Sequence, residues 1–120
     1  MSSSEEDNFG WKECRGFFQI KKRYPLTYAK LLSAKNRLQD CPKSWEAICQ
    51  HNLELFEKLI EENDPKALEE NAFNICKKES SNTTNIEMCR TTLYSARITK
   101  IMSEINRINH LFTMMGKKEI

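Results

Sequence analysis

The chain has 120 residues, of which 39% are hydrophobic and 30% charged, and its formal net charge is +2. This length allows one domain, and the modest apolar fraction predicts a thin core. There is no glycine between Phe17 and Met115 and no valine anywhere, which argues against β-sheet and excludes glycine-rich nucleotide-binding loops. The composition therefore predicts an all-α protein, a small bundle of four to five helices.

The first elements are expected to be a tail and two helices. Residues 1–8 are polar and acidic and predict a disordered tail, followed by a single helical domain over residues 9–120. A first helix is expected over about residues 9–22. Pro25 is predicted to end this pattern and to begin a second helix, because the residue before a proline is disfavoured in the helical conformation.

Two further helices are expected in the acidic middle of the chain. Ser44 is predicted to cap a third helix, whose apolar stripe lies opposite an acidic face. Asp64 and Pro65 fit the cap and the first turn of a short fourth helix over residues 65–78.

A fifth helix, over residues 85–115, has the clearest pattern. Thr84 and Glu87 fit a capping box at its start. Its apolar residues then recur at alternating intervals of four and three, which is typical of a coiled-coil seam. The seam consists of Tyr94, Ile98, Ile101, Ile105, Ile108, Phe112 and Met115. Because this helix is longer than a compact bundle needs, the seam is interpreted as a surface that binds a protein partner or a second copy of the chain.

Charge is divided into blocks along the sequence. Residues 11–40 carry eight basic and two acidic side chains, whereas residues 41–74 carry three basic and eight acidic ones. The basic segment 12–37 contains Lys21, Lys22 and Arg23 beside aromatic residues. Cations neutralise phosphates and aromatic rings stack on bases, so nucleic-acid binding through these three cations is an alternative function. The same pattern also suits an anionic membrane surface or a solvated helix end.

The sequence offers little support for catalysis or for a cofactor or metal. His51 and His110 are far apart, and Cys49 and His51 would point in different directions on one helix. A cysteine nucleophile paired with a histidine is formally available, but no local motif supports it. We therefore expect a protein that is not an enzyme and that carries no cofactor and no metal.

Five cysteines leave the redox state open. Without a recognisable signal peptide or membrane span, we expect an intracellular protein, cytoplasmic or nuclear, whose reduced thiols pack as small apolar groups. The alternative is a disulfide-stabilised helical protein of the mitochondrial intermembrane space. In that case Cys76 and Cys89 would bridge the fourth and fifth helices, and Cys41 and Cys49 would fix the start of the third. The fifth cysteine is Cys14.

Taken together, these features predict a non-catalytic helical interaction module, a small subunit or adaptor of a larger assembly. Its partner is expected to bind by coiled-coil or helix-in-groove burial of the seam on the C-terminal helix, guided by the basic segment.

Overall fold

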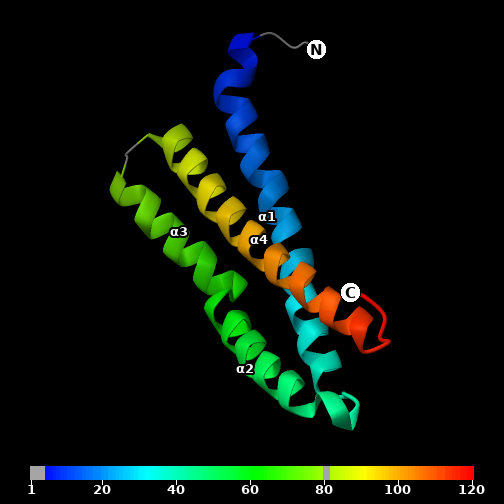
Figure 1. Ribbon diagram of the computed structural model, residues 1–120. Helices are drawn as coiled ribbons and strands as arrows, with labels where there is room; N and C mark the ends of the chain where they lie inside the picture. The colour runs from blue at the N-terminus through cyan, green and yellow to red at the C-terminus, as the bar shows by residue number, and fades with distance from the viewer. Residues whose placement is uncertain (1–4, 80–81) are drawn as a thin grey trace.

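The computed structural model describes residues 5–79 and 82–120, with side chains from Gly16 to Lys78 and from Asn82 onward. This part of the chain contains four α-helices and one 3-10 turn, with no strand (Figure 1). The elements are α1 (Glu5–Leu38), η1 (Lys43–Trp45), α2 (Glu46–Glu62), α3 (Pro65–Glu79) and α4 (Thr83–Met114). The predicted all-α bundle with a long C-terminal helix is confirmed.

The helices are arranged as three rods. Helices α1 and α4 lie side by side and run in the same direction, and α2 and α3 follow one another in the opposite direction (Figure 1). The 17 residues of α2 and the 15 of α3 together match the 32 residues of α4. The Cα atoms span 59 × 32 × 15 Å, so the bundle is elongated and thin. The length of α4 predicts that it extends beyond the rest of the bundle. In the structure it does not, because α2 and α3 together are as long as α4.

Helix α1 is one continuous helix, and the prediction of a break at Pro25 is wrong. Tyr24 and Leu31, on either side of the proline, are 1% and 0% exposed against the other rods. Burial of these large side chains outweighs the roughly 3 kcal/mol that an internal proline costs a helix. The helix begins at Glu5, inside the segment predicted to be a disordered tail, and residues 1–4 lie outside the described part of the chain.

The caps of the middle helices agree with the prediction at one position and differ at another. The Asp64 carboxylate accepts a hydrogen bond of 3.1 Å from the Ala67 N–H, so the predicted cap of α3 is confirmed. Ser44 lies instead within the 3-10 turn, and α2 follows Trp45 without a side-chain cap. The chain therefore enters α2 through a tight turn, and the predicted cap at Ser44 is wrong.

The start of α4 also differs from the predicted capping box. The Asn82 side chain accepts a hydrogen bond of 3.2 Å from the Asn85 N–H and caps the helix in place of Thr84. The Glu87 carboxylate turns to Arg90, whose Nη1 lies 2.8 Å away. The acid that the box requires is thus used in an ion pair one turn further along the helix.

The junction between α2 and α3 is held by side chains from both long helices. The Tyr24 hydroxyl donates a hydrogen bond of 2.8 Å to the Asn63 carbonyl, and the Tyr28 hydroxyl donates one of 3.2 Å to the Ile60 carbonyl. From α4, Arg97 Nη1 donates to the Asn63 side-chain oxygen at 3.1 Å. The two tyrosine hydroxyls satisfy main-chain carbonyl groups at the end of α2, and Arg97 holds the Asn63 side chain in place.

Two disulfides tie neighbouring elements together. Cys41 in the loop after α1 is bonded to Cys49 on α2, and Cys76 on α3 is bonded to Cys89 on α4. The expectation of reduced thiols is therefore wrong for these four residues, and the alternative pairing is confirmed. The Cys14 side chain lies outside the described part of the structure.

Candidate functional site

The seam predicted to bind a partner forms the core of the chain itself. Ile98 is 5% exposed and Ile105 is 1% exposed, and the other apolar residues of the seam are similarly buried except at its end. There, Met115 is half-buried, with its Sδ 3.7 Å from Cys49 Sγ. The buried positions of α1 pack in the same core as this face, because α1 and α4 run in the same direction and lie against each other (Figure 1). The seam is an intramolecular interface, so the prediction that it is free to bind a partner is corrected.

The three cations predicted to contact a polyanion are separated by the fold. Lys21 turns inward and forms an ion pair with Glu69 on α3. Lys22 and Arg23 are exposed, and Lys22 Nζ lies 5.3 Å from the centroid of the Phe18 ring. These side chains therefore do not form one anion-binding cluster.

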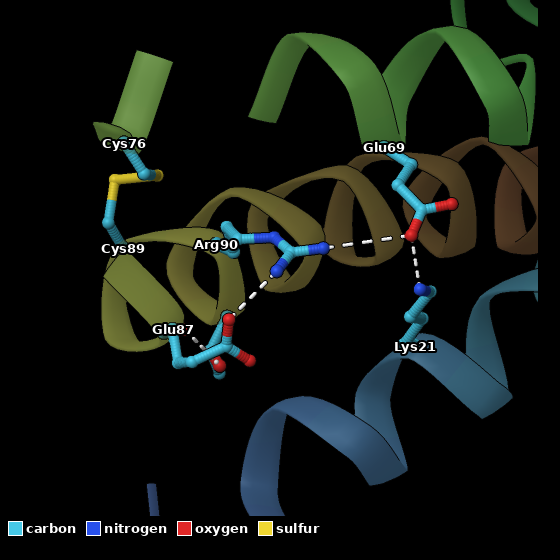
Figure 2. A network of polar contacts seen from close by, with 7 residues as sticks. Lys21, Glu69, Cys76, Glu87, Cys89 and Arg90 are labelled. Carbon is cyan, nitrogen blue, oxygen red and sulfur yellow. Dashed lines mark hydrogen bonds and ion pairs between the residues drawn. A yellow bond between two sulfur atoms is a disulfide. The ribbon is translucent and has the colours of Figure 1, made fainter. Parts of the chain in front are cut away.

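Lys21 belongs to a polar network that joins three helices (Figure 2). Glu69 accepts from Lys21 and also lies 3.6 Å from Arg90 Nη2. Arg90 in turn reaches Glu87 on its own helix, and the Cys76–Cys89 disulfide lies close to the network (Figure 2). This arrangement neutralises its own charges, which makes it a structural clamp.

Arg90 is the buried centre of that network, at 9% exposure. Its guanidinium lies 4.1 Å from the centroid of the Phe17 ring and 5.3 Å from that of Phe73. Such cation–π contacts compensate part of the cost of burying the charge. Burial, together with the nearby Glu69 carboxylate, raises the pKa of Tyr94, whose ring contacts Phe17 edge-on.

The charged side chains described on α1 are all basic, and they share its outer surface with exposed apolar residues such as Leu26, which is 70% exposed. Between Gly16 and Leu38 there are six basic residues and no acidic one. Arg23, Lys30 and Arg37 recur at intervals of seven, so they lie on one face of the helix. In this cationic stripe, Arg23 borders α4 in a hollow that α2 and α3 do not line, and Arg37 contacts the residues that follow α4.

A groove lies between α1 and α4 beside Arg23. It contains a hollow of about 420 Å³ whose walls come from these two helices alone. The lining residues are Ile20, Arg23, Ser95, Ile98, Thr99, Met102, Ser103 and Asn106. The floor is therefore apolar, the α4 wall carries uncharged hydrogen-bonding groups, and the α1 wall carries a cation.

Beyond Asn106, the chain's own C-terminal tail contacts the same two helices. Gly116, with a φ of 78°, ends α4 in a left-handed turn, and the tail runs back beside the helix (Figure 1). The Asn109 side chain accepts a hydrogen bond of 2.7 Å from the Ile120 N–H and donates one of 3.3 Å to the Ile120 carbonyl. Arg37 donates to the carbonyls of Lys118 and Glu119.

The remaining chemistry-bearing residues do not form a second site. His51 and His110 are both exposed and lie on different helices. Cys41 and Cys49 are bonded to each other, so neither offers a thiolate to a metal or a substrate. Among the side chains that the structure describes, residues 16–78 and 82–120, no group of acidic, histidine and cysteine residues is placed to hold a metal ion. None of the described helices combines the length and apolar composition needed to cross a membrane.

Comparison with known protein families, with curated proteins and with solved structures gives no match to this chain.

The groove was not predicted from the sequence, although one signal points to it. The seven-residue spacing of Arg23, Lys30 and Arg37 marks a cationic stripe that is separate from the buried face. The sequence alone does not show that α4 lies beside this stripe with its hydroxyl and amide side chains.

Proposed function

We propose that this protein is a non-catalytic helical interaction module, and that its partner-binding surface is the groove between α1 and α4. The observation that carries this proposal is the incomplete covering of the α1–α4 pair. Helices α2 and α3 cover one side of the pair, and the C-terminal tail covers one end of the other side. The rest of that side contains an open hollow with an apolar floor, lined by residues of α1 such as Ile20 and residues of α4 such as Asn106.

The non-catalytic character is inferred from the composition of this surface. Its polar groups are hydroxyls, one amide and an arginine, without a histidine, thiol or carboxylate in the lining. General acid–base or nucleophilic chemistry requires a titratable group within reach of a reacting atom. The surface is suited to recognition, as in a small subunit or adaptor.

We further infer that the protein works in an oxidising compartment. Two disulfides in a chain of this length are typical of such compartments and rare in the reducing cytosol. This favours the alternative localisation, the mitochondrial intermembrane space, over the cytoplasm or nucleus. Counting free thiols in protein isolated directly from its source tests this inference, because a reducing compartment would leave all five cysteines reactive.

Site-specific photocross-linking tests the binding surface. A benzophenone side chain placed at Thr99, in the groove, is expected to give a discrete adduct with a partner in an extract of the source cells. The control position is Glu54, which is exposed on α2. Equal labelling from both positions, or adducts from Glu54 alone, would contradict the groove as the binding surface.

A further inference from the structure

The C-terminal tail shows how the groove holds a polypeptide. Residues 117–120 are not helical, and Asn109 holds both the N–H and the carbonyl of Ile120. Arg37 binds carbonyl groups of the tail from the α1 side. These contacts are made to main-chain atoms, so the groove is suited to an extended backbone as well as to particular side chains.

We propose that the open part of the groove binds an extended acidic segment of a partner protein. This inference rests on the proposed function and names the class of segment that the same surface takes. The open hollow lies between the same two helices as the tail, and like the tail's contacts its lining includes an arginine from α1 and an asparagine from α4. On α1, Lys30 lies one heptad and Arg23 two heptads before Arg37, and on α4 Asn106 lies close in sequence before Asn109. Arg23 and Asn106 both line the hollow.

Charge favours an acidic occupant. No acidic side chain is among the residues that line the hollow, and the described side chains of α1 include none between Gly16 and Leu38. The tail already provides one example of an acid held here, since the Thr113 hydroxyl donates a hydrogen bond of 3.1 Å to the Glu119 carboxylate. Ser103 and Thr99 present the same donor along the open part of the α4 wall.

The length of the open groove sets the length of the segment. From Ser95 to Asn106, α4 rises by roughly 16 Å at about 1.5 Å per residue. An extended chain covers that distance in about five residues at roughly 3.3 Å each. Alternate side chains of such a segment point in opposite directions. Apolar residues can therefore reach Ile20 and Met102, while acidic residues reach the cationic stripe of α1.

The test uses a labelled peptide of four Glu-Ile repeats, with blocked ends, and the full-length oxidised protein. Fluorescence anisotropy is expected to show saturable binding that weakens as salt is added, because the contacts with the cationic stripe are ionic. The double variant Arg23→Glu/Lys30→Glu should weaken binding at least tenfold. The matched control, Lys58→Glu/Lys66→Glu, makes the same change in net charge at exposed residues on α2 and α3 and should change affinity less than twofold.

A second pair of variants tests the apolar floor. Met102→Glu places an acid in the hollow and should weaken peptide binding at least tenfold, whereas Met114→Glu alters a methionine that is 60% exposed and outside the lining. Thermal melts followed by circular dichroism establish that each variant remains folded. A folded Met102→Glu variant with unchanged affinity would overturn the proposal.

Several other results would also overturn it. They are equal binding of a Lys-Ile repeat peptide, loss of binding in the control variant, and sedimentation as a dimer through this groove. Association with phosphatidylserine vesicles that is abolished by Arg23→Glu/Lys30→Glu, without peptide binding, would assign the surface to a membrane. If the cross-link from Thr99 captures a partner but the acidic peptide does not bind, the interaction function stands and the acidic extended class is wrong.

Discussion

The Tyr24 hydroxyl donates a hydrogen bond of 2.8 Å to the Asn63 carbonyl, at the point where α2 ends and α3 begins. Asn63 is 1% exposed, and its own side chain donates to the Leu59 carbonyl at 2.7 Å. The bond therefore forms away from water and supplies a donor that the helix end lacks. Through it, α1 fixes the place where the middle rod changes from one helix to the next.

Removal of this hydroxyl is expected to destabilise the fold. Tyr24→Phe keeps the ring and leaves the Asn63 carbonyl with one partner fewer, which should lower the free energy of unfolding by about 1–2 kcal/mol. Urea denaturation followed by far-UV circular dichroism measures the change. Tyr28→Phe is the matched control, because its bond to Ile60 is 3.2 Å long and only half-buried, so a smaller loss is expected. Equal losses would contradict a special role for Tyr24.

Alkaline pH is expected to destabilise the fold through ionisation of Tyr24. Burial raises the pKa of Tyr24 from 10.0 to about 12. The hydroxyl is protonated in both states below the unfolded pKa, so its stabilisation is complete there. As the pH rises from about 10 to about 12 the unfolded state ionises first, and up to about 3 kcal/mol of stability is lost.

Denaturation between about pH 9 and about pH 12 measures this loss. Burial also raises the pKa of Tyr28 and that of Tyr94. Tyr24→Phe should therefore reduce the loss of stability at alkaline pH, and the other two tyrosines should account for the loss that persists. Ultraviolet titration of tyrosinate gives the ionisation directly. An identical pH dependence in the variant would show that Tyr24 does not govern the alkaline loss of stability.

Local signals predicted the elements of this fold, while the contacts between elements decided the rest. The cap at Asp64 and the apolar seam of α4 were recognisable because both depend on residues a few positions apart. The helix through Pro25 was not recognisable, because a proline's cost is local whereas the burial that offsets it comes from distant helices. Periodicity also does not reveal whether a seam is covered by the same chain or by another one, so it does not distinguish the buried seam of α4 from a partner surface.

Because the seam of α4 is buried within the chain, substitutions in it are expected to destabilise the fold. Ile105 is 1% exposed, so Ile105→Ala should cost about 2–5 kcal/mol of unfolding free energy through lost burial and a cavity. Met114 is 60% exposed on the same helix, and Met114→Ala should change stability by no more than about 0.5 kcal/mol. A stable Ile105→Ala variant that loses only an association with another protein would restore the seam as a binding surface.

The disulfides should stabilise the fold to different extents. Cys76 and Cys89 are 13 residues apart and Cys41 and Cys49 are 8 apart, so the chain-entropy model gives about 3 and about 2.5 kcal/mol. Paired alanine variants compared in urea measure both values. Four of the five cysteines are bonded within the chain, so titration in denaturant without reductant should detect no more than one thiol. Reaction of all five thiols would contradict both bonds.

Arg90 should contribute more to stability than the lysine that shares its partner. Arg90 is 9% exposed between two aromatic rings, whereas the side chains of Lys21 and Glu69 are 41% and 42% exposed. Arg90→Met should therefore cost about 2–4 kcal/mol, because Glu87 loses its partner and both rings lose a cation. Lys21→Met removes a solvated ion pair and should cost no more than about 1 kcal/mol. Denaturation of the two single variants and the double variant measures the coupling through Glu69. A larger loss for Lys21→Met than for Arg90→Met would place the centre of the network on α1.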